Sequence, residues 1–229
     1  MGKPLCVAFD CDGVLADSIS SWKTIHDHFG TDSTDLLKQF MAGELTDTEF
    51  MAADIAMWKE KSPKIHRDDL FRAYSGCKLM KGAKELVADL KAAGIHVAIV
   101  SAGVDLYVQS IAALVKADDW IANGFEWDDG GWLIGGLPTR VLSHEKGLMV
   151  EKLARINGFG TEEIVCVGDS STDLSMIVGE SGFIGFNPAR KRAVAAFEEA
   201  GVPIVQGKDL RKIWPYIYPE EDHVPRRSG

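Results

Sequence analysis

The stretch Leu5-Cys6-Val7-Ala8-Phe9-Asp10-Cys11-Asp12-Gly13-Val14 decides how the rest of the chain is interpreted. Its short apolar start predicts a strand that is buried on both faces, as in a parallel sheet. Carboxylates are rarely buried unless they are paired or bind a metal, and alternate side chains of an extended segment share one face. Asp10 and Asp12 therefore indicate a site at the carboxyl end of this strand, where open α/β sheets bind ligands. A simple strand-to-turn boundary explains the same residues, because Asp and Gly are common in turns.

The composition is that of a globular protein with an excess of acidic residues. The 229 residues include 46% hydrophobic and 26% charged side chains, and the formal net charge is −9. This charge argues against nucleic acid or an anionic membrane as the main partner, and an anionic substrate would require a metal ion or local lysines. The N-terminus lacks the apolar core of a signal peptide, and no run is long enough to span a membrane. We therefore expect a cytoplasmic protein that binds neither nucleic acid nor membranes.

The cysteines support the same expectation. They show no CxxC spacing, and Cys6 and Cys166 lie inside strand-like apolar runs. We interpret the four cysteines as reduced core residues and not as a zinc site or a disulfide framework.

A helical region follows the first strand. Apolar spacing and capping residues predict helices from Ser18 to about Phe40 with a break at Gly30-Thr31-Asp32, from Thr46, Asp47 or Thr48 to about Lys61, and from Asp68 to Tyr74. The first of these helices is expected to place on one stripe the residues Ile19, Trp22, Ile25, His26 and Phe29. Residues 16–76 contain no convincing strand, so we predict that they form a helical cap inserted after the first strand.

From Lys81 onward, helices and strands alternate. Apolar runs at 96–100, 164–168, 183–186 and 202–205 predict strands, and the segments 82–93, 105–116, 145–157 and 188–200 predict helices. Residues 120–134 contain Asp128-Asp129-Gly130-Gly131 and predict a β-hairpin. This order predicts an α/β fold: a Rossmann-like three-layer α/β/α core with a parallel sheet, plus the small helical cap. The expected division is a core of residues 1–15 and 77–218, a cap of residues 16–76, and a flexible tail of residues 219–229.

Polar residues follow the predicted strands and indicate where a site would form. Ser101 ends one apolar run, Asp169 ends another with Asp173 beyond it, and Lys146 lies at a helix start. Each has a simpler explanation, since Ser101 and Asp173 could cap helices and Lys146 could be solvated, as most lysines are. Their shared position at the ends of strands favours a common site.

The order of these residues resembles the haloacid dehalogenase-like hydrolase superfamily over nearly the whole chain. The motifs are Asp10-Cys11-Asp12-Gly13-Val14, then Ser101, then Lys146, then Gly168-Asp169-Ser170-Ser171-Thr172-Asp173. Within that superfamily, the helical insert and three local strings are similar to the phosphoserine phosphatase-like branch: Met41-Ala42-Gly43-Glu44-Leu45, Val100-Ser101-Ala102-Gly103-Val104-Asp105 and Lys146-Gly147.

The resemblance implies an activity and a role for each motif residue. Asp10 would attack phosphorus to form an aspartyl-phosphate, and Asp12 would protonate the leaving alkoxide and then activate water. The expected cofactor is Mg²⁺, which suits hard oxygen ligands and would neutralise the repulsion between a phosphate and a carboxylate. The implied metal ligands are Asp10, the backbone carbonyl of Asp12, and Asp169, with Asp173 supporting the metal or orienting Lys146. The phosphoryl oxygens would be bound by Ser101, the Ala102 amide and Lys146.

The cap departs from the pattern of phosphoserine phosphatases. A Glu that reads the substrate amine is matched by Ile19, and an Arg that reads the substrate carboxylate is matched by Asp54. We therefore do not expect L-phosphoserine itself, and Asp54 would instead face a cationic or polyol leaving group, unless it is simply a solvated helix residue. The candidate specificity residues are Asp54, Ser20, Trp22 and Thr172, although Trp22 at helical spacing is also typical of a cap core.

The expected function is therefore a Mg²⁺-dependent phosphatase that acts on a small phosphorylated metabolite. Two alternatives remain open: a phosphotransferase or phosphomutase that uses the same aspartyl-phosphate, and a non-enzymatic protein that binds a phosphometabolite. The expected assembly is a monomer or a homodimer.

Overall fold

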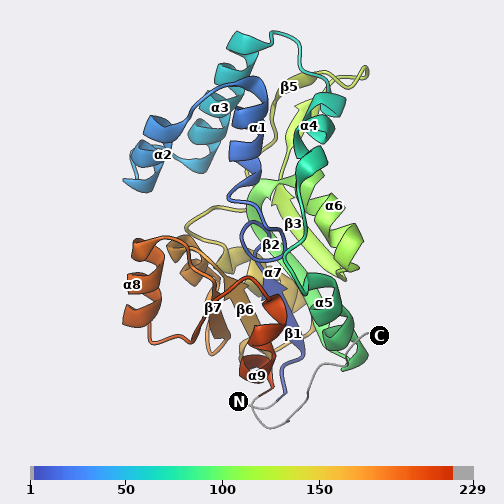
Figure 1. Cartoon of the computed structure of the whole chain (residues 1–229), viewed down its shortest axis with the longest axis vertical. Helices are drawn as coiled ribbons and strands as arrows, with labels where there is room; N and C mark the ends of the chain where they lie inside the picture. Colours follow the sequence, from blue (N-terminus) through green and yellow to red (C-terminus); the bar gives the residue numbers. More distant parts are fainter. Residues whose placement is uncertain (1–2, 219–229) are drawn as a thin grey trace.

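The computed structural model describes residues 3–218, so the predicted tail of residues 219–229 lies outside the described residues. Its centre is a six-stranded parallel sheet in the order β3-β2-β1-β6-β7-β8 (Figure 1). The strands are β1 (Cys6–Phe9), β2 (His96–Val104), β3 (Asp119–Asn123), β6 (Ile164–Gly168), β7 (Gly182–Phe186) and β8 (Ile204–Val205). The chain proceeds from β1 to β2 and β3 on one side and then crosses to β6 on the other. The end of β1 is therefore the topological switch point, where a crevice opens in such sheets.

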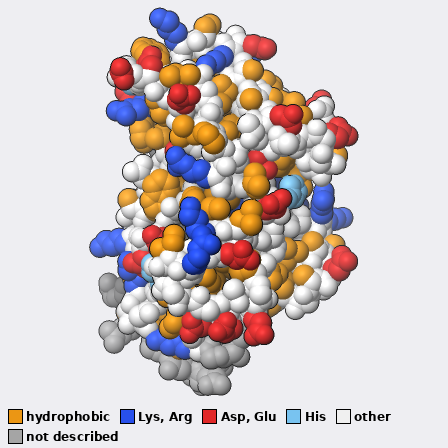
Figure 2. All heavy atoms as spheres, turned by 180° about the vertical axis from the view of Figure 1, so that it is seen from behind, with side chains coloured by type: hydrophobic (Ala, Val, Ile, Leu, Met, Phe, Trp, Pro, Cys, Tyr) orange, Lys and Arg blue, Asp and Glu red, His pale blue; other side chains and the backbone are white. Residues whose placement is uncertain are grey.

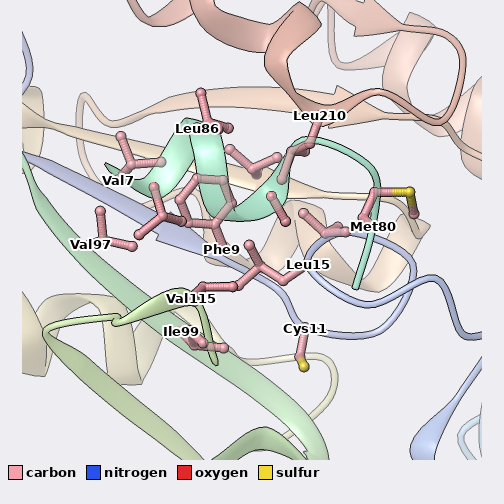
Figure 3. Close-up of a cluster of buried hydrophobic side chains, with 14 of the residues drawn as sticks. Val7, Phe9, Cys11, Leu15, Met80, Leu86, Val97, Ile99, Val115 and Leu210 are labelled. Carbon is pink, nitrogen blue, oxygen red and sulfur yellow. The ribbon is translucent and has the colours of Figure 1, made fainter. Parts of the chain in front are cut away.

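The opening strand lies at the centre of the hydrophobic core. All four residues of β1 are buried, and they alternate between the two faces of the sheet. Val7 and Phe9 pack with α5 (Ala83–Ala92), α6 (Asp105–Val115) and α9 (Trp214–Ile217), as Figure 3 shows for part of this cluster. Cys6 and Ala8 face the opposite side. Burial of each large apolar side chain contributes roughly 1.5–3 kcal/mol relative to exposure, so this strand anchors both layers.

The second face is covered by α7 (Gly147–Asn157) and α8 (Lys191–Glu199). The short 3₁₀ helices are η1 (Tyr74–Gly76), η2 (Thr161–Glu163), η3 (Ser171–Met176) and η4 (Leu210–Ile213). Helices on both faces of a parallel sheet give the three-layer α/β/α Rossmann-like core, which confirms the predicted fold class.

The cap lies above the carboxyl ends of the strands (Figure 1). Its helices are α1 (Ser21–Phe29), α2 (Thr34–Met41), α3 (Asp47–Lys61) and α4 (Arg67–Ala73). The capping box at Thr46 was among the predicted starts of α3. Two corrections concern α1 and α8. The first helix begins at Ser21 after the N-cap Ser20, so Ile19 lies before it and is 75% exposed instead of on its apolar stripe. The helix predicted from residue 188 begins at Lys191.

The hairpin predicted at residues 120–134 begins later in the structure, at Phe125. Residues 119–123 form β3 and pair with β2, and the hairpin itself consists of β4 (Phe125–Trp127) and β5 (Leu133–Gly136). The sequence pattern could not separate them, because β3 and β4 are divided by Gly124 alone. The hairpin also packs with the cap helices: Phe125 and Leu133 belong to one buried cluster with Ile25, Ile55 and Trp58.

The surface carries side chains of every type, and the cysteines form no disulfide among the described residues. Figure 2 shows acidic, basic and hydrophobic side chains interspersed over the face opposite to that of Figure 1. Among residues 3–218, no helix has the length and apolar character needed to cross a bilayer. All four cysteines are free, and three of them, Cys6, Cys11 and Cys166, are buried.

Candidate active site

Lys146 connects two carboxylates at the end of the central strands. Asp10 directly follows β1, and its amide donates to the carbonyl of Val167 in β6, which fixes its position. Lys146 Nζ lies 2.8 Å from Asp10 Oδ1 and 2.6 Å from Asp173 Oδ1. The lysine is only 4% exposed, so the alternative that it is a solvated surface residue is wrong. The buried ammonium group of Lys146 thus forms ion pairs with two carboxylates, so removal of either partner would leave an uncompensated buried charge.

Asp173 supports the loop that carries Asp169. Its Oδ2 accepts hydrogen bonds from the backbone amides of Asp169 and Ser170 and from the Ser170 hydroxyl. With Oδ1 on Lys146, both of its oxygens are occupied by the protein. Among the described residues, none donates a hydrogen bond to the carboxylate of Asp169, which leaves that group free to bind a ligand. The two aspartates of this loop thus have different tasks.

The electrostatics of the carboxylates favour a cation between them. Oxygens of Asp10, Asp169 and Asp173 lie within 4.8 Å of one another. Burial raises the pKa of Asp10 to about 7, and burial together with the neighbouring Asp173 raises the pKa of Asp169 to about 8. Burial would lower the pKa of Lys146, but the carboxylates of Asp10 and Asp173 outweigh it and raise the pKa. One ammonium group therefore faces three carboxyls, and an additional cation would favour their ionised forms. Three hard oxygen donors suit a divalent ion of the magnesium type.

Gly13 leaves the space into which Asp169 projects. The glycine has φ +78°, and a Cβ atom there would lie 2.4 Å from Asp169 Oδ2. Any other residue at this position would displace the carboxylate. The motif at residues 10–14 therefore needs a glycine so that Asp169, from the motif at residues 168–173, can take its place.

Asp12 is held by hydroxyl groups from the segment that enters the cap. Ser18 Oγ donates to Asp12 Oδ1 at 2.5 Å, and the Ser21 amide and hydroxyl donate to Oδ2 at 2.9 and 2.8 Å. Tyr107 on α6 donates to Ser18 Oγ at 3.1 Å. Burial raises the pKa of Asp12, and these hydrogen bonds oppose that rise. The Asp12 carboxylate thus points to these donors, and the resemblance-based expectation that it binds metal through its backbone carbonyl stays a prediction.

Ser101 and Ala102 lie at the end of β2 beside Asp12. Ser101 is 1% exposed and lies within the strand, so the alternative that it caps a helix is wrong. Its hydroxyl accepts a hydrogen bond from the Gly103 amide. The Ala102 carbonyl accepts from Trp22 Nε1 at 3.0 Å, which anchors the cap to this strand. Trp22 also stacks on Trp58 with ring centroids 6.0 Å apart, so it belongs to both the cap core and the site.

These residues surround a cavity of about 660 Å³ between the core and the cap. The predicted residues that line it are Asp10, Asp12, Ser101, Ala102, Lys146, Asp169 and Asp173 from the core and Ser20, Trp22, Asp54 and Thr172 as specificity candidates. Asp54 is 1% exposed, so the alternative that it is a solvated helix residue is wrong. Ser20 caps α1, and Thr172 lies 2.7 Å from the hydroxyl of Ser170.

The sequence analysis did not identify the roles of Ser18, Ser21 and Tyr107. Serines at a helix start indicate capping, and nothing in the local pattern relates them to Asp12. Only the position of the cap on the core brings them together.

Residues 7–177 match the family model of the haloacid dehalogenase-like hydrolases. The chain belongs to this family and, within it, to the phosphoserine phosphatase-like branch of phosphatases.

Individual relatives support the assignment. The phosphoserine phosphatase of Archaeoglobus fulgidus is 32% identical over 183 residues, which are 79% of this chain and 52% of that protein. This chain therefore spans about half the length of the Archaeoglobus protein. The phosphoserine phosphatase of Methanocaldococcus jannaschii is 30% identical over 80% of this chain and 82% of its own length. A solved structure of a phospho-aspartyl intermediate analogue of phosphoserine phosphatase is 28% identical, covers 93% of this chain and 99% of its own, and has a TM-score of 0.77.

Proposed function

We propose that this chain is a Mg²⁺-dependent phosphomonoesterase that acts on a small phosphorylated metabolite through an aspartyl-phosphate on Asp10. The single observation that carries the proposal is the contact of Lys146 with both Asp10 and Asp173, directly beside the free carboxylate of Asp169. A phosphatase that uses a carboxylate nucleophile needs positive charge beside it, because its substrate is a dianion; Lys146 supplies one positive charge, and a metal ion at the carboxylates would supply the rest.

The residues divide the reaction between them. Asp10 attacks phosphorus while the bond from phosphorus to the leaving oxygen breaks, and Asp12 gives its proton to that oxygen. Asp12 then removes a proton from the water that attacks the aspartyl-phosphate and releases inorganic phosphate. Ser101, the amide of Ala102 and Lys146 bind the phosphoryl oxygens and stabilise their charge in the transition state.

The metal would be held by Asp10, the backbone carbonyl of Asp12, and Asp169, with Asp173 as a support. When bound, Mg²⁺ supplies positive charge that reduces the repulsion between the substrate and Asp10. The cap would close over a small substrate and exclude water from the intermediate. Boundaries of the cap at residues 15/16 and 76/77 stay a prediction. A monomer or a homodimer stays the prediction for assembly, and the four free cysteines, three of them buried, support a cytoplasmic location.

The test is hydrolysis of p-nitrophenyl phosphate by the full chain with and without Mg²⁺. We expect turnover that chelation abolishes and that Asp10→Asn reduces to background. Asp10→Asn removes the nucleophile but keeps the shape of the side chain, so its thermal unfolding serves as the control for folding. Transfer of the phosphoryl group to an added alcohol instead of to water would favour the phosphotransferase alternative. No turnover of any phosphate ester with metal present would contradict the proposal and leave only a binding role.

A further inference from the structure

Asp54 is a buried carboxylate that meets a single potential donor, His26, among the described residues. It lies on α3 in the wall of the cavity and is 1% exposed. His26 Nε2 is 2.9 Å from Asp54 Oδ1, and this contact opposes the rise in the pKa of Asp54 that burial causes, whereas Oδ2 has no partner among the described residues. A buried carboxylate with an unpaired oxygen is costly and rare, so Asp54 can accept further hydrogen bonds from a ligand that supplies donors.

His26 does not cancel the charge of Asp54. Trp58 Nε1 lies 3.2 Å from His26 Nδ1, and an indole nitrogen can only donate. The Nδ1 atom therefore accepts from Trp58, and it lies 2.7 Å from Thr31 Oγ1. The hydrogen of the neutral imidazole then sits on Nε2, the nitrogen that faces Asp54. The pair carries one net negative charge when Asp54 is ionised.

Part of the cap wall is apolar, and its other polar members are Asp17, Ser18, Ser20, Lys23, Ser33 and Asp47. Leu37, Met41, Phe50 and Met51 line the cavity together with the ring of Trp22. The cations at the cavity are placed elsewhere, since Lys146 is bound to Asp10 and the exposed Lys23 is paired with Asp27. The remaining ones, Lys208, Arg190 and Arg192, belong to the core side and are exposed. Within residues 3–218, the cap thus offers a buried negative group to a substrate and no buried lysine or arginine.

We propose that Asp54 binds a primary ammonium group on the alcohol part of the substrate, so that the preferred substrate is the phosphate ester of a small amino alcohol without a carboxylate. This inference rests on the proposed function and specifies its substrate class. A primary ammonium has three N–H donors, enough for both carboxylate oxygens, whereas a quaternary ammonium has none. A substrate carboxylate would be repelled by Asp54 and would find no buried cation in the cap wall.

The test compares O-phosphoethanolamine with propyl phosphate, a neutral ester of similar size, and with O-phospho-L-serine and phosphocholine. We expect kcat/KM for O-phosphoethanolamine to exceed that of each of the other three by about tenfold or more. Asp54→Asn keeps the size of the side chain and removes its charge, so the ratio of O-phosphoethanolamine to propyl phosphate should fall to about one. Asp35→Asn removes the same charge from an exposed site of the cap, with 87% of that side chain accessible, and should leave the ratio unchanged.

The outcomes separate the two proposals. Turnover of p-nitrophenyl phosphate with equal kcat/KM for the charged and the neutral esters in the unaltered protein overturns the role of Asp54 and leaves the phosphatase intact. Absence of all turnover contradicts the proposed function instead. Binding then still tests Asp54, because O-phosphoethanolamine should raise the thermal unfolding temperature more than propyl phosphate does at equal concentration. Equal shifts overturn the inference, and neither of these wild-type measurements depends on the folding of a variant.

Discussion

The hydroxyl of Ser21, the first residue of α1, lies 2.8 Å from Oδ2 of Asp12 and donates a hydrogen bond to it. The same oxygen of Ser21 accepts the amide of Val104 at the end of β2. A Cβ atom on Gly103 would lie 2.5 Å from this oxygen, so a glycine is needed for the approach. One cap serine thus connects the proposed proton-transfer residue to the end of β2.

Ser21→Ala should selectively slow the hydrolysis of esters that have poor leaving groups. The change removes a donor that positions Asp12, and proton transfer to an alkoxide depends on that position. We expect kcat/KM for an alkyl phosphate to fall about 10–100-fold and that for p-nitrophenyl phosphate to fall less, because nitrophenolate leaves without a proton. Ser110→Ala, which removes a hydroxyl bonded to the Leu106 carbonyl on exposed α6 surface, is the control. Equal losses on both esters would argue that Ser21 serves only the fold.

Lys146→Met should lower both activity and stability. The variant leaves the buried carboxyls of Asp10 and Asp173 without their ammonium partner, and such a loss typically costs about 3–5 kcal/mol. Loss of a charge-stabilising donor also lowers kcat by about 10²–10³-fold. Urea unfolding and steady-state kinetics measure the two effects. Lys208→Met, which breaks an exposed ion pair with Asp17, should change the free energy of unfolding by less than about 1 kcal/mol.

Gly13→Ala should raise the Mg²⁺ concentration that activity requires, in addition to destabilising the fold through the backbone. The added methyl group would overlap Asp169 Oδ2, so we expect the Mg²⁺ concentration for half-maximal activity to rise about tenfold. Gly43→Ala is a matched control, because Gly43 has nearly the same φ, +77°, but no atom within 4 Å of its Cβ position. Both variants should lose about 1–2 kcal/mol of stability from the left-handed backbone. A similar Mg²⁺ dependence for the two variants would contradict the proposed role of Asp169.

Asp209→Asn should lower stability in a pH-dependent way. Arg211 donates two side-chain hydrogen bonds to Asp209, and these lower the pKa of the carboxyl below its usual value. A lowered pKa contributes stability above the unfolded-state pKa of about 3.9, and that contribution is lost as the pH falls through the folded-state value. The difference from the unaltered protein should therefore be about 1 kcal/mol at pH 7 and shrink below pH 4. Urea unfolding at pH 7, 5 and 3.5 measures it, and a constant difference would refute the ionic contribution.

The core of the fold followed from local patterns, because its strands are short, apolar and separated by amphipathic helices. Cys6–Phe9 is buried on both faces and could be recognised from its residues alone. The division between β3 and β4 could not be recognised, since it depends on which neighbour each segment pairs with and not on its composition. The same limit applied to the hairpin, whose packing against α3 is a contact between distant parts of the chain.

The candidate site shows the same contrast. Asp10, Asp169 and Lys146 stand at strand or helix ends, where the fold itself brings polar residues together. Ser21 and His26 lie inside a helix of the cap, and their roles depend on how that helix is oriented over the sheet. Spacing in the sequence carries no information about that orientation.

The position of the β4–β5 hairpin has a consequence for synthesis of the protein. The cap helices end before residue 77, but the side chains of Phe125 and Leu133 that complete their hydrophobic cluster are added to the chain about fifty residues later. During translation, the apolar faces around Trp58 and Ile55 therefore remain uncovered until the ribosome has passed the hairpin. Uncovered faces of this kind promote aggregation, so a chain truncated before Phe125 should require chaperone assistance that the full chain does not.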